Sequence, residues 1–212
     1  GVQTCALPIL DWSWGKLYAI HLEPNGASYK ATKEEFVSGK PLSLTDMVIR
    51  PADGAMYFLV GGRGNQSGLY RMTWTGGGDT SPAPGAAPAP ELKLRTEIEA
   101  LQSAPPSPLV VDKVWPHLDH PDRFIRFAAR SVIERQPVDL WTRKALNETR
   151  PWASLTSLLA VARTHPDDSA LQLQLLRALG RNNWSSLTEE QQLAALRTAS
   201  AARASSACPI WG

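Results

Sequence analysis

Short apolar runs broken by turn-forming residues fill the first part of the chain, residues 10–75. The runs are rich in tyrosine, tryptophan, valine, isoleucine and phenylalanine, which favour strands, and the breaks contain glycine, asparagine and proline. Asn25-Gly26 and Asp53-Gly54 suit tight turns, because glycine accepts a positive φ at little cost. The pattern therefore predicts an antiparallel meander of short strands, with the runs GKLYAIHL, YKATKEEFV, TDMVI, AMYFLVGG and GLYRMTW.

Three of these strands follow one another with very short connections. On the template of a β-propeller blade, residues 44–50 form the inner strand, residues 55–61 the second strand and residues 68–74 the third. The runs GKLYAIHL and YKATKEEFV then form the third and outer strands of the preceding blade. Residues 10–75 are therefore expected to form a partial β-propeller of about one and a half blades.

The pattern changes after residue 75. Residues 76–90 contain no large apolar side chain and consist mainly of glycine, proline, alanine and serine, which predicts a linker. From residue 91 to residue 203 the apolar positions recur with the helical period of about 3.6. The segment HPDRFIRFAARSVIERQP shows this most clearly, since its apolar residues form one stripe and Pro137 ends the helix. Ser186 and Glu189 have the spacing of a capping box for a later helix.

Helices are expected in pairs along the second part of the chain. They cover residues 91–103, 109–118, 121–135, 138–148, 151–164, 168–180 and 187–202. Pairs of short helices that recur every ~35–45 residues are typical of an α-solenoid. The run DRFIRFAARSVIE also resembles the second half of a HEAT repeat, with Asp122 and Arg126 at the usual acidic and basic positions. We therefore expect HEAT-like α-helical repeats over residues 91–203.

The two ends of the chain depart from these patterns. The first nine residues, GVQTCALPI, read like the translation of a sequencing adapter, of the kind found at the ends of metagenomic contigs. We therefore leave residues 1–9 out of the predicted fold and expect Leu10 to be an internal position of a longer protein. Residues 204–212 are expected to form an irregular tail, because the amphipathic pattern stops before them.

Charge and composition restrict the function. Lys and Arg number 22 against 20 Asp and Glu, a net charge of +2, so no strong field attracts nucleic acid or anionic lipid. No apolar run reaches the ~18 residues of a membrane span. Cys5 and Cys208 lie near opposite ends without a C-x-x-C motif, and no metal site is predicted from them. The sequence thus predicts no nucleic-acid partner and no membrane span in this piece.

A family resemblance is carried by three segments in this order: DWSWGKLYAIHLEPNGASY, residues 36–74, and HPDRFIRFAARSVIERQP. They resemble the junction between propeller and HEAT repeats in large bacterial proteins of the membrane-bound dehydrogenase family, which are related to sugar and sorbosone dehydrogenases. The string TD…DGAMYF…GGRG…GLYR is the most specific part. The resemblance implies a periplasmic or extracellular quinoprotein with PQQ as cofactor of the full-length parent. Haem c would belong to a further module, since this chain has no C-x-x-C-H.

Four residues are candidates for the cofactor site under this resemblance. Arg63 is the large side chain of the glycine-rich loop VGGRGNQSG, and its guanidinium would bind a carboxylate of a cofactor or substrate. Asp11, Trp12 and Asp46 lie where strand-end residues of a propeller face the central channel. The structural alternatives are turn capping or blade packing for these three residues, and a solvated turn for Arg63. No nucleophile elbow, phosphate loop or Rossmann fingerprint is present, so catalytic residues are not assigned.

Two functional classes follow from this reading. The first is a fragment of a quinoprotein-like dehydrogenase, inactive alone, whose parent oxidises a small sugar or alcohol. The second is a non-catalytic propeller and HEAT scaffold that binds glycan or protein partners, with the helical repeats offering a surface for a protein.

His117 and His120 flank Asp119, but this junction is expected to hold helix caps and not a metal ion. His21 is expected on a strand surface.

Overall fold

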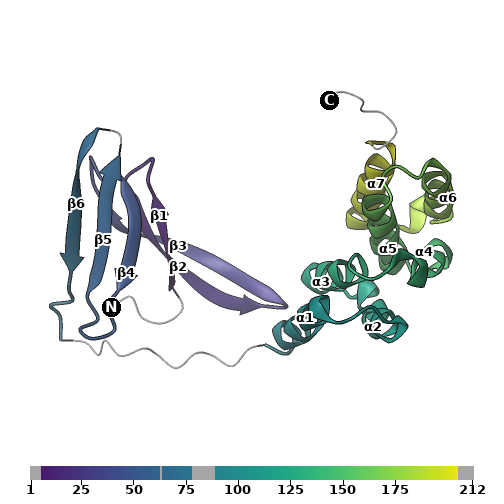
Figure 1. Cartoon of the computed structure of the whole chain (residues 1–212), viewed down its shortest axis with the longest axis horizontal. Coiled ribbons are helices and arrows are strands. Elements are labelled where there is room, and N and C mark those ends of the chain that lie inside the picture. Colours follow the sequence, from purple (N-terminus) through teal and green to yellow (C-terminus); the bar gives the residue numbers. More distant parts are fainter. Residues whose placement is uncertain (1–5, 63, 78–88, 205–212) are drawn as a thin grey trace. The chain divides into compact units, whose positions relative to one another are not determined.

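A computed structural model describes residues 6–62, 64–77 and 89–204 of the 212-residue chain (Figure 1). The chain divides into two compact units, Gly1–Pro88 and Ala89–Gly212. In the described residues, all strands belong to the first unit and all helices to the second. The predicted order of β structure followed by α structure is therefore confirmed. Most of the predicted linker and tail, and both cysteines, lie outside the described residues.

The first sheet has three antiparallel strands in the order β1-β2-β3. They are β1 (Ala6–Asp11), β2 (Lys16–Asn25) and β3 (Ser28–Ser38). Asn25 pairs with Ser28 across a two-residue turn, and Gly26 in this turn has a φ of 58°. A positive φ is what a tight hairpin turn requires. The predicted turn at Asn25-Gly26 is therefore confirmed.

The second sheet has three antiparallel strands in the order β4-β5-β6. They are β4 (Leu44–Ile49), β5 (Met56–Gly62) and β6 (Asn65–Met72). In the turn between β4 and β5, Gly54 has a φ of 65°, and the amide of Ala55 donates a 3.1 Å hydrogen bond to Asp53 Oδ1. Three strands were predicted here, and each lies within three residues of its predicted bounds.

An apolar core joins the two sheets. Leu17 of β2, Leu44 of β4 and Phe58 of β5 are buried and belong to one cluster with Met56 and Val60. The buried residues of β5, Met56, Phe58 and Val60, are two positions apart, because successive side chains of a strand point to opposite faces. Each sheet therefore packs one of its faces against the other sheet.

The opposite faces of both sheets carry exposed apolar side chains among charged ones. Val48, Leu59 and Leu69 lie on the face of β4–β6 that points away from the core, and all three are exposed. On the first sheet, Leu7 and Ile9 of β1 also face away from the core and are exposed. Strands that are apolar on both faces are typical of sheets that are covered on both sides.

The first strand begins earlier than the sequence analysis predicted. β1 starts at Ala6 and pairs with β2 along its whole length, from Ala6 opposite His21 to Asp11 opposite Lys16. Without β1 this edge of β2 would carry unpaired backbone groups, and residues 6–10 supply an apolar segment that pairs with them. Residues 6–9 therefore belong to the fold, which differs from the sequence prediction. Their resemblance to an adapter concerns their origin and stays a prediction.

Gly15, in the turn between β1 and β2, has no room for a side chain. Its φ is 63°, and a Cβ atom would lie 2.5 Å from the carbonyl oxygen of Gly39. Gly54 has a similar φ of 65° but open space at the Cβ position. We expect Gly15→Ala to lower the free energy of unfolding by about 3 kcal/mol and Gly54→Ala by about 1 kcal/mol. Urea unfolding of both variants measures the difference, and equal effects would contradict the backbone clash.

The described part of the second unit contains seven α-helices (Figure 1). They are α1 (Pro90–Ala100), α2 (Pro108–Val114), α3 (Arg123–Ile133), α4 (Thr142–Asn147), α5 (Pro151–Thr164), α6 (Ser169–Leu179) and α7 (Glu189–Ala204). Short 3₁₀ turns lie at Leu101–Ser103, Trp115–Asp119, Val138–Leu140 and Trp184–Ser186. With these turns included, the helices agree with the predicted bounds to within three residues.

Helix α5 is the central helix of this unit. It is buried on nearly all sides through small and apolar residues: Ala153, Ser154, Leu155, Ser157, Leu158, Ala160, Val161 and Ala162. A helix that is apolar around most of its circumference lies inside a protein. Accordingly, α5 contacts α3, α4, α6 and α7. Helices α3 and α7, far apart in the sequence, therefore pack on the same central helix.

The cap of α7 differs from the predicted one. The amide of Thr188 donates to Gln191 Oε1 at 3.0 Å, and the amide of Gln191 donates to Thr188 Oγ1 at 3.3 Å. This reciprocal pair is a capping box. Ser186 instead lies in a 3₁₀ turn, where its hydroxyl donates to the carbonyl oxygen of Asn183. The box predicted for Ser186 and Glu189 was therefore wrong by two positions.

Glu148 links the end of α2 to the start of α5. Its carboxylate accepts hydrogen bonds from Trp115 Nε1 at 2.7 Å, Arg150 Nη2 at 2.8 Å and the amide of Thr149 at 2.9 Å. The side chain is only 10% exposed. Burial raises the pKa of Glu148, but these hydrogen bonds outweigh burial and lower the pKa to about 2. The ionised carboxylate therefore stabilises this junction.

Candidate functional site

Two of the predicted site residues, Asp11 and Trp12, lie at the end of β1 and make structural contacts. Asp11 Oδ1 accepts a 3.0 Å hydrogen bond from the amide of Trp14, as a turn cap does. Trp12 Nε1 donates to the carbonyl oxygen of Gly61 at 3.1 Å, and the indole ring lies against Gly62. Trp12 therefore connects the first sheet with β5 of the second.

Asp46 and Arg63, the other two predicted site residues, belong to the second sheet and the loop that follows β5. Asp46 lies opposite Leu59, and its Oδ1 accepts a 2.8 Å hydrogen bond from the amide of Met47. Arg63 lies outside the described residues. The structure therefore brings Trp12 beside the glycine that precedes Arg63, while Asp46 binds a neighbouring amide.

The histidines around Asp119 form a helix junction. Asp119 Oδ1 accepts a 3.1 Å hydrogen bond from the amide of Ala153 at the start of α5. His120 Nδ1 accepts a 3.0 Å hydrogen bond from the amide of Asp122. Burial, followed by the charge of His120, lowers the pKa of His117. Over the part of the chain that the structure describes, no three His, Cys, Asp or Glu side chains come together as metal ligands would.

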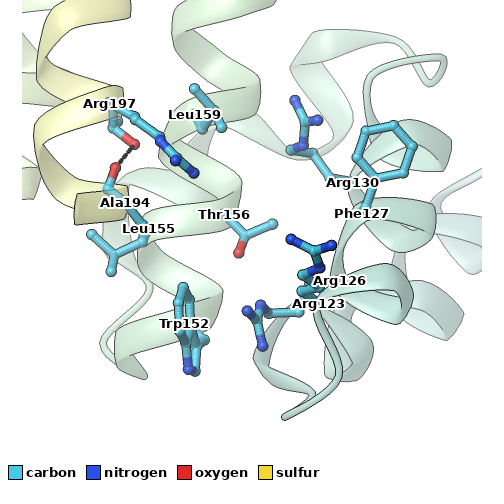
Figure 2. A pocket seen from close by; sticks show the side chains of 11 residues that line it. Arg123, Arg126, Phe127, Arg130, Trp152, Leu155, Thr156, Leu159, Ala194 and Arg197 are labelled. Carbon is cyan, nitrogen blue, oxygen red and sulfur yellow. Dashed lines mark hydrogen bonds between the residues drawn. The ribbon is translucent and has the colours of Figure 1, made fainter. Parts of the chain in front are cut away.

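A groove of about 180 Å³ lies between α3, α5 and α7 (Figure 2). Four of the eleven residues that line this arginine groove are arginines: Arg123, Arg126 and Arg130 of α3, and Arg197 of α7. None of the eleven is acidic. The three arginines of α3 are three and four positions apart, so they share one face of that helix. Positive charge therefore reaches the groove from two helices.

Arg126 is the fixed member of the arginine groove. The residue is 7% exposed. Its Nη1 donates to the carbonyl oxygens of His120 at 2.6 Å and Pro121 at 2.8 Å. The guanidinium also lies 3.7 Å from the centre of the Trp152 ring, in a cation–π contact. These contacts hold one positive charge and one aromatic ring in place before any ligand arrives.

The other arginines differ in whether a carboxylate neutralises them. Arg130 donates to Glu134 at 2.7 Å, and Arg163 donates to the same carboxylate oxygen at 3.0 Å. Burial lowers the pKa of Arg130, and the charge of Glu134 acts in the opposite direction. Among the described residues, neither Arg123 nor Arg197 takes part in an ion pair. These two exposed guanidinium groups therefore remain available to an anion.

The backbone amides beside the arginine groove are already satisfied. Asp122 Oδ1 accepts a 2.7 Å hydrogen bond from the amide of Phe124 at the start of α3. Asp119 does the same for Ala153 at the start of α5. Both carboxylates, with Glu190, also favour the charged form of Arg126, whose pKa is lowered foremost by burial. Anion binding in the groove would therefore rely on side-chain guanidinium groups and not on open helix ends.

The remaining lining of the arginine groove is mostly apolar. Leu155 and Leu159 come from α5, and Ala194 comes from α7 (Figure 2). Phe127 of α3 is 56% exposed, and Arg130 lies 5.2 Å from the centre of its ring. The Thr198 hydroxyl donates to the carbonyl oxygen of Ala194. The site therefore combines unneutralised positive charge with apolar and aromatic surface.

Sequence reasoning placed no site residue in the helical unit. A signal was present, because arginines 123, 126 and 130 follow the helical period beside the apolar stripe of the same segment. Arg126 was noted only for its resemblance to a HEAT position. Arg197 carries no signal of its own, since its place at the groove depends on how α7 packs on α5.

Comparison of the chain with protein-family models, with curated proteins and with solved structures finds no match. Across the described residues, no helix has both the length and the apolar character that crossing a bilayer requires. The arginine groove is therefore described by its own geometry alone, with four arginines among its lining residues.

Proposed function

We propose that the helical unit is a binding module whose arginine groove takes an acidic group of a partner. The observation that carries the proposal is the lining, which has four arginines from two helices and no acidic residue. A cleft with one sign of charge and low-dielectric walls concentrates the field on an anion. Arginine also offers a planar arrangement of donors that matches a carboxylate.

The groove supports binding better than it supports catalysis. A general base or a nucleophile must lie within hydrogen-bond reach of the reacting group. The lining contains no histidine, cysteine, lysine or carboxylate. Its hydroxyls belong to Thr156 and Thr198, and that of Thr198 donates to a backbone carbonyl. The proposed role therefore falls in the class of protein-binding scaffolds.

Fluorescence anisotropy with the full 212-residue chain tests this proposal. The probe is a fluorescein-labelled peptide of alternating glutamate and glycine, and the matched peptide has glutamine in place of glutamate. We expect the glutamate peptide to bind at least about 10-fold more tightly, since hydrogen bonds between charged groups are the stronger ones. Added salt should weaken the binding of the glutamate peptide, because interactions between exposed charges are screened. Equal binding of the two peptides, or no binding of either, would contradict the proposal.

A second proposal concerns the first unit. Here β1–β3 and β4–β6 would be neighbouring blades of a β-propeller, followed by HEAT-like repeats. The exposed apolar side chains on the outward faces of the two sheets support this arrangement, because each blade of a propeller packs between two others. The chain would then be part of a quinoprotein-like sugar or alcohol dehydrogenase in the periplasm or outside the cell, as the family resemblance implies.

PQQ, the cofactor that this second proposal implies, does not fit the predicted site residues that the structure describes. PQQ is a tricarboxylate and needs cationic partners. Asp11 and Asp46 are acidic, and each already accepts a hydrogen bond from a backbone amide. Trp12 is engaged between the two sheets. No redox step is therefore assigned to these residues, and the arginine groove remains the better supported site.

A further inference from the structure

We propose that the arginine groove receives an acidic peptide segment of another protein, in which one large apolar side chain is flanked by carboxylates. This inference rests on the proposed function and names the class of the partner. The groove offers a separate contact for each part of such a segment, namely apolar surface for the anchor side chain and guanidinium groups for the carboxylates.

The size of the groove favours a single anchor side chain over a whole small molecule. Its volume of about 180 Å³ is below the ~300–1,000 Å³ of pockets that enclose drug-sized ligands. Partner proteins commonly insert one apolar or aromatic side chain into a pocket of the opposing surface. A peptide anchor would fill the groove while the rest of the peptide stays on the surface.

The surface that would receive the anchor is apolar and partly open. Leu155 is buried, whereas Phe127 exposes 56% of its surface. Trp152 is held by its contact with Arg126. Exposed aromatic residues beside a pocket are typical of interaction surfaces. A leucine or phenylalanine of a partner would bury this surface together with its own.

The positions of the unneutralised arginines favour carboxylates on both sides of the anchor. Arg123 of α3 and Arg197 of α7 lie on different sides of Thr156 of the central helix (Figure 2). Neither forms an ion pair among the described residues. Charge complementarity across an interface increases the rate and specificity of association. An acidic residue on each side of the anchor would meet one of these arginines.

A phosphate-bearing partner is less well matched. Phosphate sites often use free backbone amides at a helix N-terminus. The two helix starts beside the arginine groove are capped by Asp122 and Asp119, and the net charge of the chain is only +2. The apolar lining would also face the polar backbone of a nucleic acid. The observations therefore favour a peptide with carboxylates.

Anisotropy titrations of the full chain with four labelled probes test this inference. The acidic-apolar peptide has one phenylalanine flanked by glutamates. The acid-only peptide has serine in place of the phenylalanine, and the apolar-only peptide has glutamine in place of every glutamate. A single-stranded oligonucleotide supplies phosphates. We expect the acidic-apolar peptide to bind about 10-fold more tightly than each of the others, since burying one large apolar side chain has an effect of that size.

Two variants separate the anchor from the charge. Phe127→Ala should weaken binding of the acidic-apolar peptide about 10-fold and leave the acid-only peptide unchanged. Leu173→Ala on α6 is the matched control, since Leu173 is 50% exposed and does not line the groove. Circular dichroism of both variants should equal that of the parent chain. If Phe127→Ala leaves the acidic-apolar peptide unaffected, the inference is wrong.

The other outcomes distinguish this inference from the function on which it rests. Equal binding of the acid-only and acidic-apolar peptides would overturn the anchor and leave the anion-binding function standing. Tighter binding of the oligonucleotide than of any peptide would overturn the peptide partner in favour of a phosphate-bearing one. Failure of all four probes to bind would overturn both proposals.

Discussion

Replacing Glu148 by glutamine should lower the free energy of unfolding of the helical unit by about 3 kcal/mol at neutral pH. Burial raises the pKa of Glu148, but donors from Arg150, Thr149 and Trp115 bring it from the ordinary 4.5 to about 2. This lowering of the pKa means that the folded protein stabilises the ionised carboxylate over the protonated form by about 3 kcal/mol. Glutamine keeps the size of the side chain and loses the charge, so the buried donors lose their charged acceptor.

The same substitution should change how stability depends on pH. Because the folded-state pKa lies below 4.5, the stabilisation is present above about pH 4.5 and is lost as the pH falls toward 2. The free energies of unfolding of Glu148→Gln and the parent chain should therefore become equal as the pH falls over that range. Urea unfolding followed by far-UV circular dichroism measures both.

Glu97→Gln on α1 is the matched control for this experiment. Glu97 is exposed, so its substitution should change the free energy of unfolding by less than about 0.5 kcal/mol. If the free energies of unfolding of Glu148→Gln and the parent chain differ by the same amount at every pH, the role given to the ionised carboxylate of Glu148 is contradicted.

Removing the charges of Arg123 and Arg197 together should weaken binding of the acidic-apolar peptide by about 100-fold. Each guanidinium would lose charged hydrogen bonds, and each loss corresponds to about 10-fold in affinity. Both residues are exposed and form no ion pair among the described residues. The double variant Arg123→Gln and Arg197→Gln should therefore keep the fold, and anisotropy with the labelled peptide measures the loss.

A second double variant separates the arginine groove from the overall charge. Arg143 and Arg177 are exposed and do not line the groove. Replacing both by glutamine changes the net charge by the same amount, but affinity should change less than about twofold because distant exposed charges are screened. Similar losses in the two double variants would show that net charge, and not the groove, attracts the peptide.

The order of the elements could be predicted because local patterns carry it. The apolar period changes near residue 90, and the turns at Asn25-Gly26 and Asp53-Gly54 are formed by residues that suit a positive φ. The cap of α7 shows the limit of such patterns. Ser186–Glu189 and Thr188–Gln191 have the same spacing, and only the 3₁₀ turn before α7 decides that the second pair forms the box.

The arginine groove could not be predicted from local patterns. Arg126 and Arg197 come together because α3 and α7 both pack on α5, and this is a property of tertiary packing. The predicted site residues show the opposite case. Asp11 and Asp46 suit a channel by their sequence position, yet each carboxylate accepts a nearby amide hydrogen bond. Short side chains that carry an acceptor often bind their own backbone in this way.

Arginine side-chain NMR of the full chain is the most direct measurement of anion binding in the groove. The acidic-apolar peptide is titrated while the Nε–Hε signals are followed, with single Arg→Gln variants supplying the assignments. We expect the signals of Arg123, Arg126 and Arg197 to shift and saturate together while that of Arg143 stays in place, because these three line the groove and Arg143 does not. Shifts of equal size at Arg143, or none at Arg123 and Arg197 while the peptide binds, would contradict the arginine groove as the binding site.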